Sequence, residues 1–158
     1  MGLTRRLFLV AGAAAVGGVA VGATVYRQPF DNPLAGFAPD GVALTPYVRI
    51  GADGRIAIVA PRAEMGQGSQ SSLAKLVAEE LDVDFDAVDV IHGPASRAYL
   101  NWRILGMSLP FPDDDTGMIA ETARGAMHVA SKFLGHQITG GSTSILEGYR
   151  PMREAGAL

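Results

Sequence analysis

The stretch Ala60-Pro-Arg-Ala-Glu-Met-Gly-Gln-Gly-Ser-Gln-Ser-Ser72 decides how the surrounding chain is expected to fold. A β-branched run at 55–60 predicts a strand before it, and apolar residues at helical spacing predict a helix over 71–81. Gly66 and Gly68 flank Gln67, and glycine permits a sharp turn and a close approach to a ligand. A helix start presents unpaired backbone N–H groups to an anion. The corner is therefore a candidate anion site; an ordinary strand–turn–helix corner is the alternative.

The remaining pattern predicts an α+β fold. A strand at 47–51 is joined to the strand at 55–60 by an Asp53-Gly54 hairpin signal, and a third strand is expected at 86–92. The order strand–strand–helix–strand suggests that the helix packs on one face of the sheet. A second helix is expected over 118–134. Its predicted apolar stripe consists of Ile119, Ala123, Ala126, Ala130 and Phe133.

A second glycine-and-hydroxyl segment, Gly140-Gly-Ser-Thr-Ser144, precedes another expected helix. Ser144 and Glu147 have the spacing of a capping box. A capping box requires neither the glycine pair nor the additional hydroxyls, so this segment is a second candidate anion site. We expect it to converge in space with the segment around Gln67.

Composition and charge exclude several classes of function. The 158 residues carry a net charge of −3, which gives no basic face for nucleic acid. Without cysteine, the chain has no disulfide framework and no cysteine ligand for zinc or for an iron–sulfur cluster. The three histidines lack metal-site spacing. The acidic run 113–115 is better placed to cap the following helix than to bind a metal.

The amino-terminal residues resemble an export signal. Arg5 and Arg6 form a twin arginine, and an uncharged apolar run follows at 7–26. We therefore expect residues 1–26 to direct the protein to the periplasm by the twin-arginine route, and to remain as a tether if they are not cleaved. A plain membrane anchor is the alternative. Residues 27–45 are rich in proline and glycine and are predicted to be a linker, which leaves 46–158 as the folded part.

Together these features resemble the molybdenum-binding large subunit of the xanthine dehydrogenase and aldehyde oxidase family, especially its isoquinoline 1-oxidoreductase beta branch. The resemblance rests on Glu64-Met-Gly-Gln-Gly68, on Leu76-Val-Ala-Glu-Glu-Leu-Asp-Val83, and on Thr139-Gly-Gly-Ser-Thr-Ser144 before Tyr149. It extends over nearly the whole chain. It implies a molybdopterin cofactor, in its mononucleotide or dinucleotide form. The cofactor-binding residues that it implies are Met65, Gly66, Gln67, Gly68, Gly141, Ser142, Thr143 and Ser144.

The resemblance also implies a function. Such subunits hydroxylate N-heteroaromatic compounds or aldehydes with oxygen from water. Electrons pass to a separate iron–sulfur subunit, with a membrane cytochrome as a further acceptor. Because no stretch here supplies the family's glutamate base, we assign no catalytic residue and no metal ligand. We expect the chain to be the amino-terminal part of such a subunit and inactive alone. An exported module that binds a phosphorylated ligand or a partner without catalysis is the alternative. A structural domain whose glycines only make turns is the third hypothesis.

Overall fold

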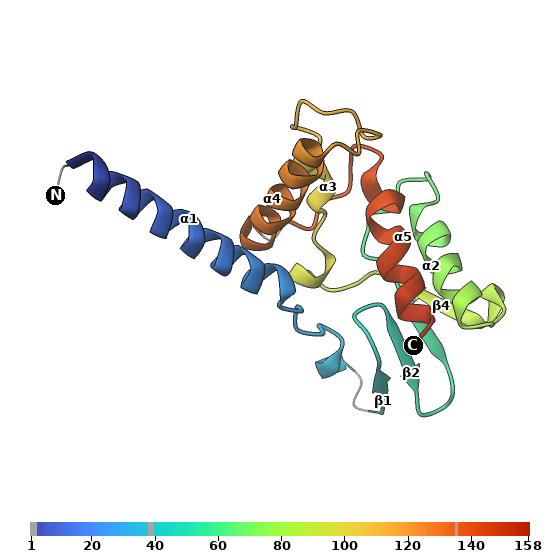
Figure 1. The fold of residues 1–158 in the computed structure, drawn as a ribbon. Coiled ribbons are helices and arrows are strands. Elements are labelled where there is room, and N and C mark those ends of the chain that lie inside the picture. The colour runs from blue at the N-terminus through green and yellow to red at the C-terminus, as the bar shows by residue number, and fades with distance from the viewer. Residues whose placement is uncertain (1–2, 38–39, 135) are drawn as a thin grey trace.

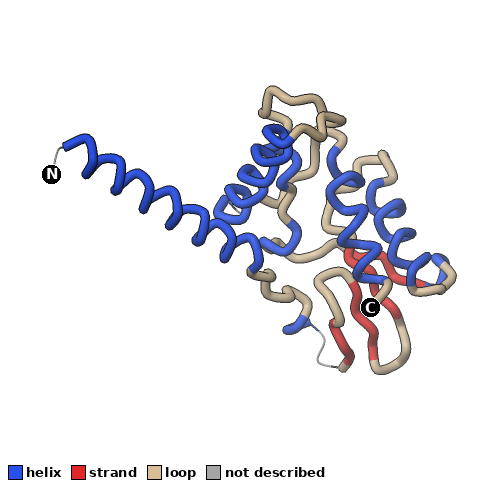
Figure 2. Tube along the Cα trace, viewed as in Figure 1, coloured by secondary structure: helices blue, strands red, loops and turns tan. Residues whose placement is uncertain are grey.

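The computed structural model contains a four-stranded mixed sheet with two helices on one face (Figures 1 and 2). The structure describes residues 3–37, 40–134 and 136–158. The strands β1 (Gly41–Ala43), β2 (Val48–Gly51), β3 (Ile56–Val59) and β4 (Val88–Ile91) lie in this order across the sheet. The first three are antiparallel, whereas β4 pairs with β3 in parallel, Ile58 opposite Val90. Helix α2 (Ser69–Glu80) connects the two parallel strands.

Helices α2 and α5 (Thr143–Gly156) lie side by side over the sheet (Figure 1). They pack there because their apolar stripes and the inward side chains of β2 and β3 leave water together. The buried residues of this core are Val48, Ile58, Ala60, Leu73, Ala74, Val77, Ala78, Met152 and Ala155. Leu34, Val59 and Tyr99 form a smaller cluster, and Tyr47 packs against both. The expected α+β class and the helix packed on the sheet are confirmed.

The elements begin and end close to their predicted positions, with additions in the regions expected to be irregular. The three predicted strands are slightly shorter than expected, and α2 begins at Ser69 instead of residue 71. β1 lies inside the predicted linker and was not predicted, because a three-residue strand has too few positions for an alternating pattern. Three short elements were also missed: η1 (Ala35–Phe37), η3 (Arg97–Tyr99) and α3 (Trp102–Gly106). The further turn η2 (Phe85–Ala87) leads into β4.

Helix α4 (Met118–Leu134) has the predicted bounds but not the predicted buried face. Ile119 and Phe133 are exposed, and the fully buried residues are Ala120 and Ser131. The contact with α3 explains the difference, because Trp102 stacks on His128 with ring centroids 5.0 Å apart. Tertiary packing therefore buries the face of α4 that carries Ala120 and Ser131, and not the more apolar face that carries Ile119 and Phe133.

Helix α1 (Leu3–Arg27) projects away from the sheet, and its own carboxyl end meets α4 (Figure 1). Lys132 of α4 donates hydrogen bonds to the backbone oxygens of Val25 and Gln28, at 3.3 and 3.2 Å. Most described side chains of α1 are exposed. Among the described residues, no helix combines the length and the apolar character needed to cross a membrane.

Candidate functional site

The loop before α2 is held in shape by its own side chains. Gly66 and Gly68 have φ values of 93° and 74°, which glycine adopts without strain. The amide of Gln67 donates to the backbone oxygen of Ala63 (2.7 Å) and to Oγ of Ser69 (2.9 Å). Its oxygen accepts from the backbone N–H of Met65 at 2.6 Å. The polar atoms of Gln67 therefore fix the loop.

Glu64 occupies the anion position at the start of α2. Its carboxylate accepts from the backbone N–H groups of Gly66 (2.8 Å), Gly68 (2.9 Å) and Gln70 (3.0 Å). These bonds hold the pKa of Glu64 below its usual value because they stabilise the charged form, and the bond from Gln70 has the largest effect. Contrary to expectation, the N–H groups of Gly68 and Gln70 at this helix start face a carboxylate of the chain and not an external anion. The chain supplies the anion itself.

A pH-dependent contribution to stability follows from this arrangement. The folded pKa of Glu64 is lowered, so its contribution is complete above the unfolded value of 4.5 and is lost as the pH falls through the folded value. We expect Glu64→Gln to flatten the fall in melting temperature below about pH 4.5. Thermal unfolding across the acidic range measures this. Glu79→Gln, at an exposed position of α2, is the control and should leave the profile unchanged. Identical profiles for wild type and Glu64→Gln would contradict the assignment.

The start of α5 is arranged differently. Gly141 and Ser142 both have positive φ, 59° and 55°, and the side chain of Ser142, the N-cap, makes no capping hydrogen bond. Thr143 is buried; its hydroxyl donates to the backbone oxygen of Gly140 (2.7 Å) and accepts from Nδ2 of Asn101 (2.6 Å). The predicted capping box of Ser144 and Glu147 is wrong, because the N-cap is Ser142, two residues earlier, and Glu147 pairs with Arg62. The positive end of α5 is left without a carboxylate of its own.

The two predicted segments meet at one cleft of about 440 Å³. Ala63 donates its N–H to Oγ1 of Thr139 at 2.8 Å, which joins the segments directly. The cleft is lined by Met65, Gln67, Ser69, Ser72, Thr139, Gly140, Ser142, Ser144 and Ile145. The predicted convergence is therefore confirmed. Four of the predicted site residues line the cleft, and the other four, Gly66, Gly68, Gly141 and Thr143, shape the loops beside it.

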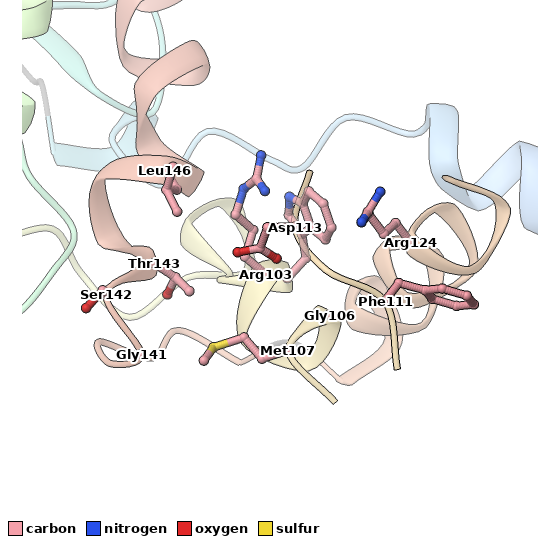
Figure 3. Close-up of a pocket in the computed structure, with 11 residues that line it drawn as sticks. Arg103, Gly106, Met107, Phe111, Asp113, Arg124, Gly141, Ser142, Thr143 and Leu146 are labelled. Atoms are coloured by element: carbon pink, nitrogen blue, oxygen red, sulfur yellow. The ribbon is translucent and has the colours of Figure 1, made fainter. Parts of the chain in front are cut away.

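A smaller pocket of about 160 Å³ lies beside the start of α5, between α3 and α4 (Figure 3). Gly141, Ser142, Thr143 and Leu146 form one side of it. The remainder is lined by one carboxylate and two guanidinium groups among apolar residues: Trp102, Arg103, Gly106, Met107, Phe111, Asp113 and Arg124. Arg124 is occupied, since it donates to the backbone oxygens of Asp115 and Pro112 and pairs with Glu121. Arg103 stacks over Trp102, 4.9 Å from the ring centre, and its buried Nε has no partner in the structure.

Comparison with known proteins identifies the family. Residues 11–102, more than half of the chain, match the family model described as molybdopterin cofactor-binding domain. The chain belongs to this family. The isoquinoline 1-oxidoreductase subunit beta of Brevundimonas diminuta is 40% identical over 96 residues, which are 60% of this chain. They make up 12% of that protein, so the chain spans a small part of its relative. No solved structure matches the present chain.

The match confirms the predicted resemblance and the molybdopterin cofactor of this cofactor-binding domain. It includes Met65–Gly68 and ends before the segment 140–144. Within the described part of the domain, no three His, Cys, Asp or Glu side chains gather where they could hold a metal ion. The candidate site is thus built from backbone N–H groups, hydroxyls and an arginine, which are donors for an anionic organic group.

The donors of this cofactor-binding domain fit molybdopterin on one side of the cleft. The phosphate of the pterin needs positive charge and hydrogen-bond donors, which the start of α5 and the guanidinium group of Arg103 would supply beside the carboxylate of Asp113. The start of α2 is less suited, because Glu64 binds the N–H groups of Gly68 and Gln70 there. Sequence reasoning did not find Arg103. The local sequence gives no signal for it, since α3 is only five residues long and lies in a stretch predicted to be irregular.

Proposed function

We propose that the chain supplies two cofactor-contacting segments of a molybdenum hydroxylase subunit. The substrate class is N-heteroaromatic compounds or aldehydes, hydroxylated with oxygen from water, and the electrons pass to a separate iron–sulfur subunit and onward to a membrane cytochrome. Membership of the molybdopterin cofactor-binding family supports this proposal. The similarity to an isoquinoline 1-oxidoreductase subunit supports it further. The twin arginine at residues 5 and 6 supports export to the periplasm, with residues 1–26 as signal or tether.

The convergence of the two segments at one cleft carries the proposal. Met65 and Gln67 would line one side of the pterin rings, and Ser142 and Ser144 would line the opposite side of these rings. The phosphate end would lie toward Gly141 and Arg103, where the N-cap side chain of α5 makes no capping hydrogen bond. When bound, the molybdenum cofactor supplies the redox chemistry. The chain itself binds the cofactor, orients it and limits the access of water to one side of it.

Cofactor retention tests the proposal. The chain is produced in cells that synthesise molybdopterin, and bound pterin is quantified by fluorescence after oxidation, together with molybdenum by mass spectrometry. We expect pterin to co-purify. Arg103→Met should reduce retention about 10- to 100-fold, the range for losing a hydrogen bond to a charged group. Arg55→Met is the matched control, because Arg55 is exposed on the hairpin.

The possible results separate the two parts of the proposal. A wild-type chain without pterin would overturn the cofactor-binding role. Equal retention by the wild type and Arg103→Met would remove Arg103 from the site and leave the cleft as its location.

A further inference from the structure

We propose that the buried ion pair of Arg62 and Glu147 is a positioning device that fixes the separation of the two cleft-forming segments. Arg62 immediately precedes the loop 63–68, and Glu147 lies in the first turns of α5. The two residues are 85 positions apart in sequence, and Nη2 of Arg62 donates to Oε2 of Glu147. What the cleft binds rests on the proposed function, whereas the positioning role does not.

Arg62 is fixed from several directions. Its side chain is 2% exposed. Nη1 donates to the backbone oxygens of Tyr99 (2.6 Å) and Pro61 (3.3 Å), and Nη2 donates to that of Leu100 at 3.4 Å. A planar guanidinium can satisfy such a set of acceptors in one orientation only. The start of the loop is therefore tied at one point to α5 and to the segment before α3.

Glu147 gives the pair its rigidity. Its side chain is 11% exposed, and burial raises its pKa even though the charge of Arg62 acts in the opposite direction. Moving a carboxylate in such a place away from its partner costs free energy, because no water replaces the lost contact. The first turns of α5 are thereby held at a fixed distance from the loop.

Apolar packing alone would not fix this distance. The helices α2 and α5 share the apolar core residues Leu73, Val77, Met152 and Ala155, and an ion pair of Arg153 with Glu80 joins them at the end of α2 opposite the loop 63–68. Hydrophobic contacts are not directional, so two apolar faces can shift with little change in buried area. Buried polar and charged groups specify a register more strictly. Two further hydrogen bonds join the residues around Arg62 to the segment before α5: the side chain of Gln137 donates to the backbone oxygen of Pro61 (3.2 Å), and the N–H of Ala63 donates to Thr139 (2.8 Å).

The absence of cysteine from the sequence makes a direct test practicable. Cysteines introduced at Met65 and Ile145, two exposed positions on opposite sides of the cleft, can carry spin labels for a distance measurement. We expect a single narrow distance in the otherwise wild-type chain. Replacing the pair by Arg62→Met with Glu147→Met keeps the volume apolar and leaves no unpaired charge. This variant should fold and should lose the single narrow distance.

Controls distinguish positioning from general stability. Val77→Ala weakens the core beside Gly156, at the carboxyl end of α5, and should keep the narrow distance although the chain melts earlier. Arg62→Lys retains the charge but not the fork of donors, and should also lose the narrow distance; it decides the question if the double variant does not fold. An unchanged narrow distance in the folded double variant, or in Arg62→Lys, would overturn the proposal.

Pterin retention by the label-free double variant is the second measurement. We expect a loss of about 10- to 100-fold, as found when residues that orient ligands are replaced. If the wild-type chain retains no pterin, the proposed function fails, and the distance measurement still decides the role of the pair. If the double variant loses the narrow distance and retains pterin fully, the separation of the segments is not what the cofactor requires, and that part of the inference is wrong.

Discussion

Arg62→Met should lower the free energy of unfolding by about 3–5 kcal/mol, the usual loss when one partner of a buried ion pair is removed. The substitution leaves Glu147 buried and charged without its partner. Denaturant unfolding measures the loss. Relative to a total stability of about 5–15 kcal/mol for a typical domain, the effect is large.

The same variant should show a distinctive dependence on pH. Burial already raises the pKa of Glu147 in the wild type, and loss of Arg62 removes the charge that opposes this shift. An acid with a raised folded pKa binds its proton more readily in the folded state, so acidification relieves the unpaired charge. The destabilisation should therefore be smaller in acid than at neutral pH. A loss below about 1 kcal/mol, as for a surface pair, would contradict the buried pairing.

Leu73→Ala should lower the free energy of unfolding by about 2–5 kcal/mol, because a large side chain is removed from a closely packed site. Leu73 is 1% exposed in the core of α2, α5 and the sheet. A Cβ built on Gly148 would lie 2.5 Å from Cδ2 of Leu73, which shows how closely α5 approaches.

The matched control for Leu73→Ala is Leu146→Ala, the same chemical change on α5 at a position that is 57% exposed. It should change the stability by no more than about 0.5 kcal/mol. Equal losses in the two variants would contradict the placement of Leu73 in the core. Thermal unfolding of both proteins under one set of conditions makes the comparison.

Local patterns predicted the main elements of this fold because each element carries its own periodicity. Helix 118–134 and the three longer strands have enough positions to display it. The pairing of β4 with β3 in parallel depends on how α2 returns across the sheet, which no local pattern records. The exposed Ile119 and Phe133 of α4 show the same limit, since the neighbouring α3 decides which face is covered.

The candidate site was predictable where glycine and hydroxyl residues cluster, and not where distant side chains intervene. The two loops meet as expected, but the anion at the start of α2 is Glu64 of the same loop. Arg62 lies within the stretch 60–72, but the local sequence did not indicate its role, because its partner is 85 residues away. Arg103 was likewise hidden in a segment expected to be irregular. Helix-start chemistry can be predicted from sequence, but the groups that compete for it cannot.

The carboxylate of Glu64 has a thermodynamic consequence for ligand binding. By bridging the N–H groups of Gly66, Gly68 and Gln70, it orders the loop before any ligand arrives. A flexible loop loses about 1–2 kcal/mol of backbone entropy for each residue that a ligand immobilises. Here that cost is met during folding, so a cofactor entering the cleft finds one of its walls already rigid and keeps more of its contact energy as affinity.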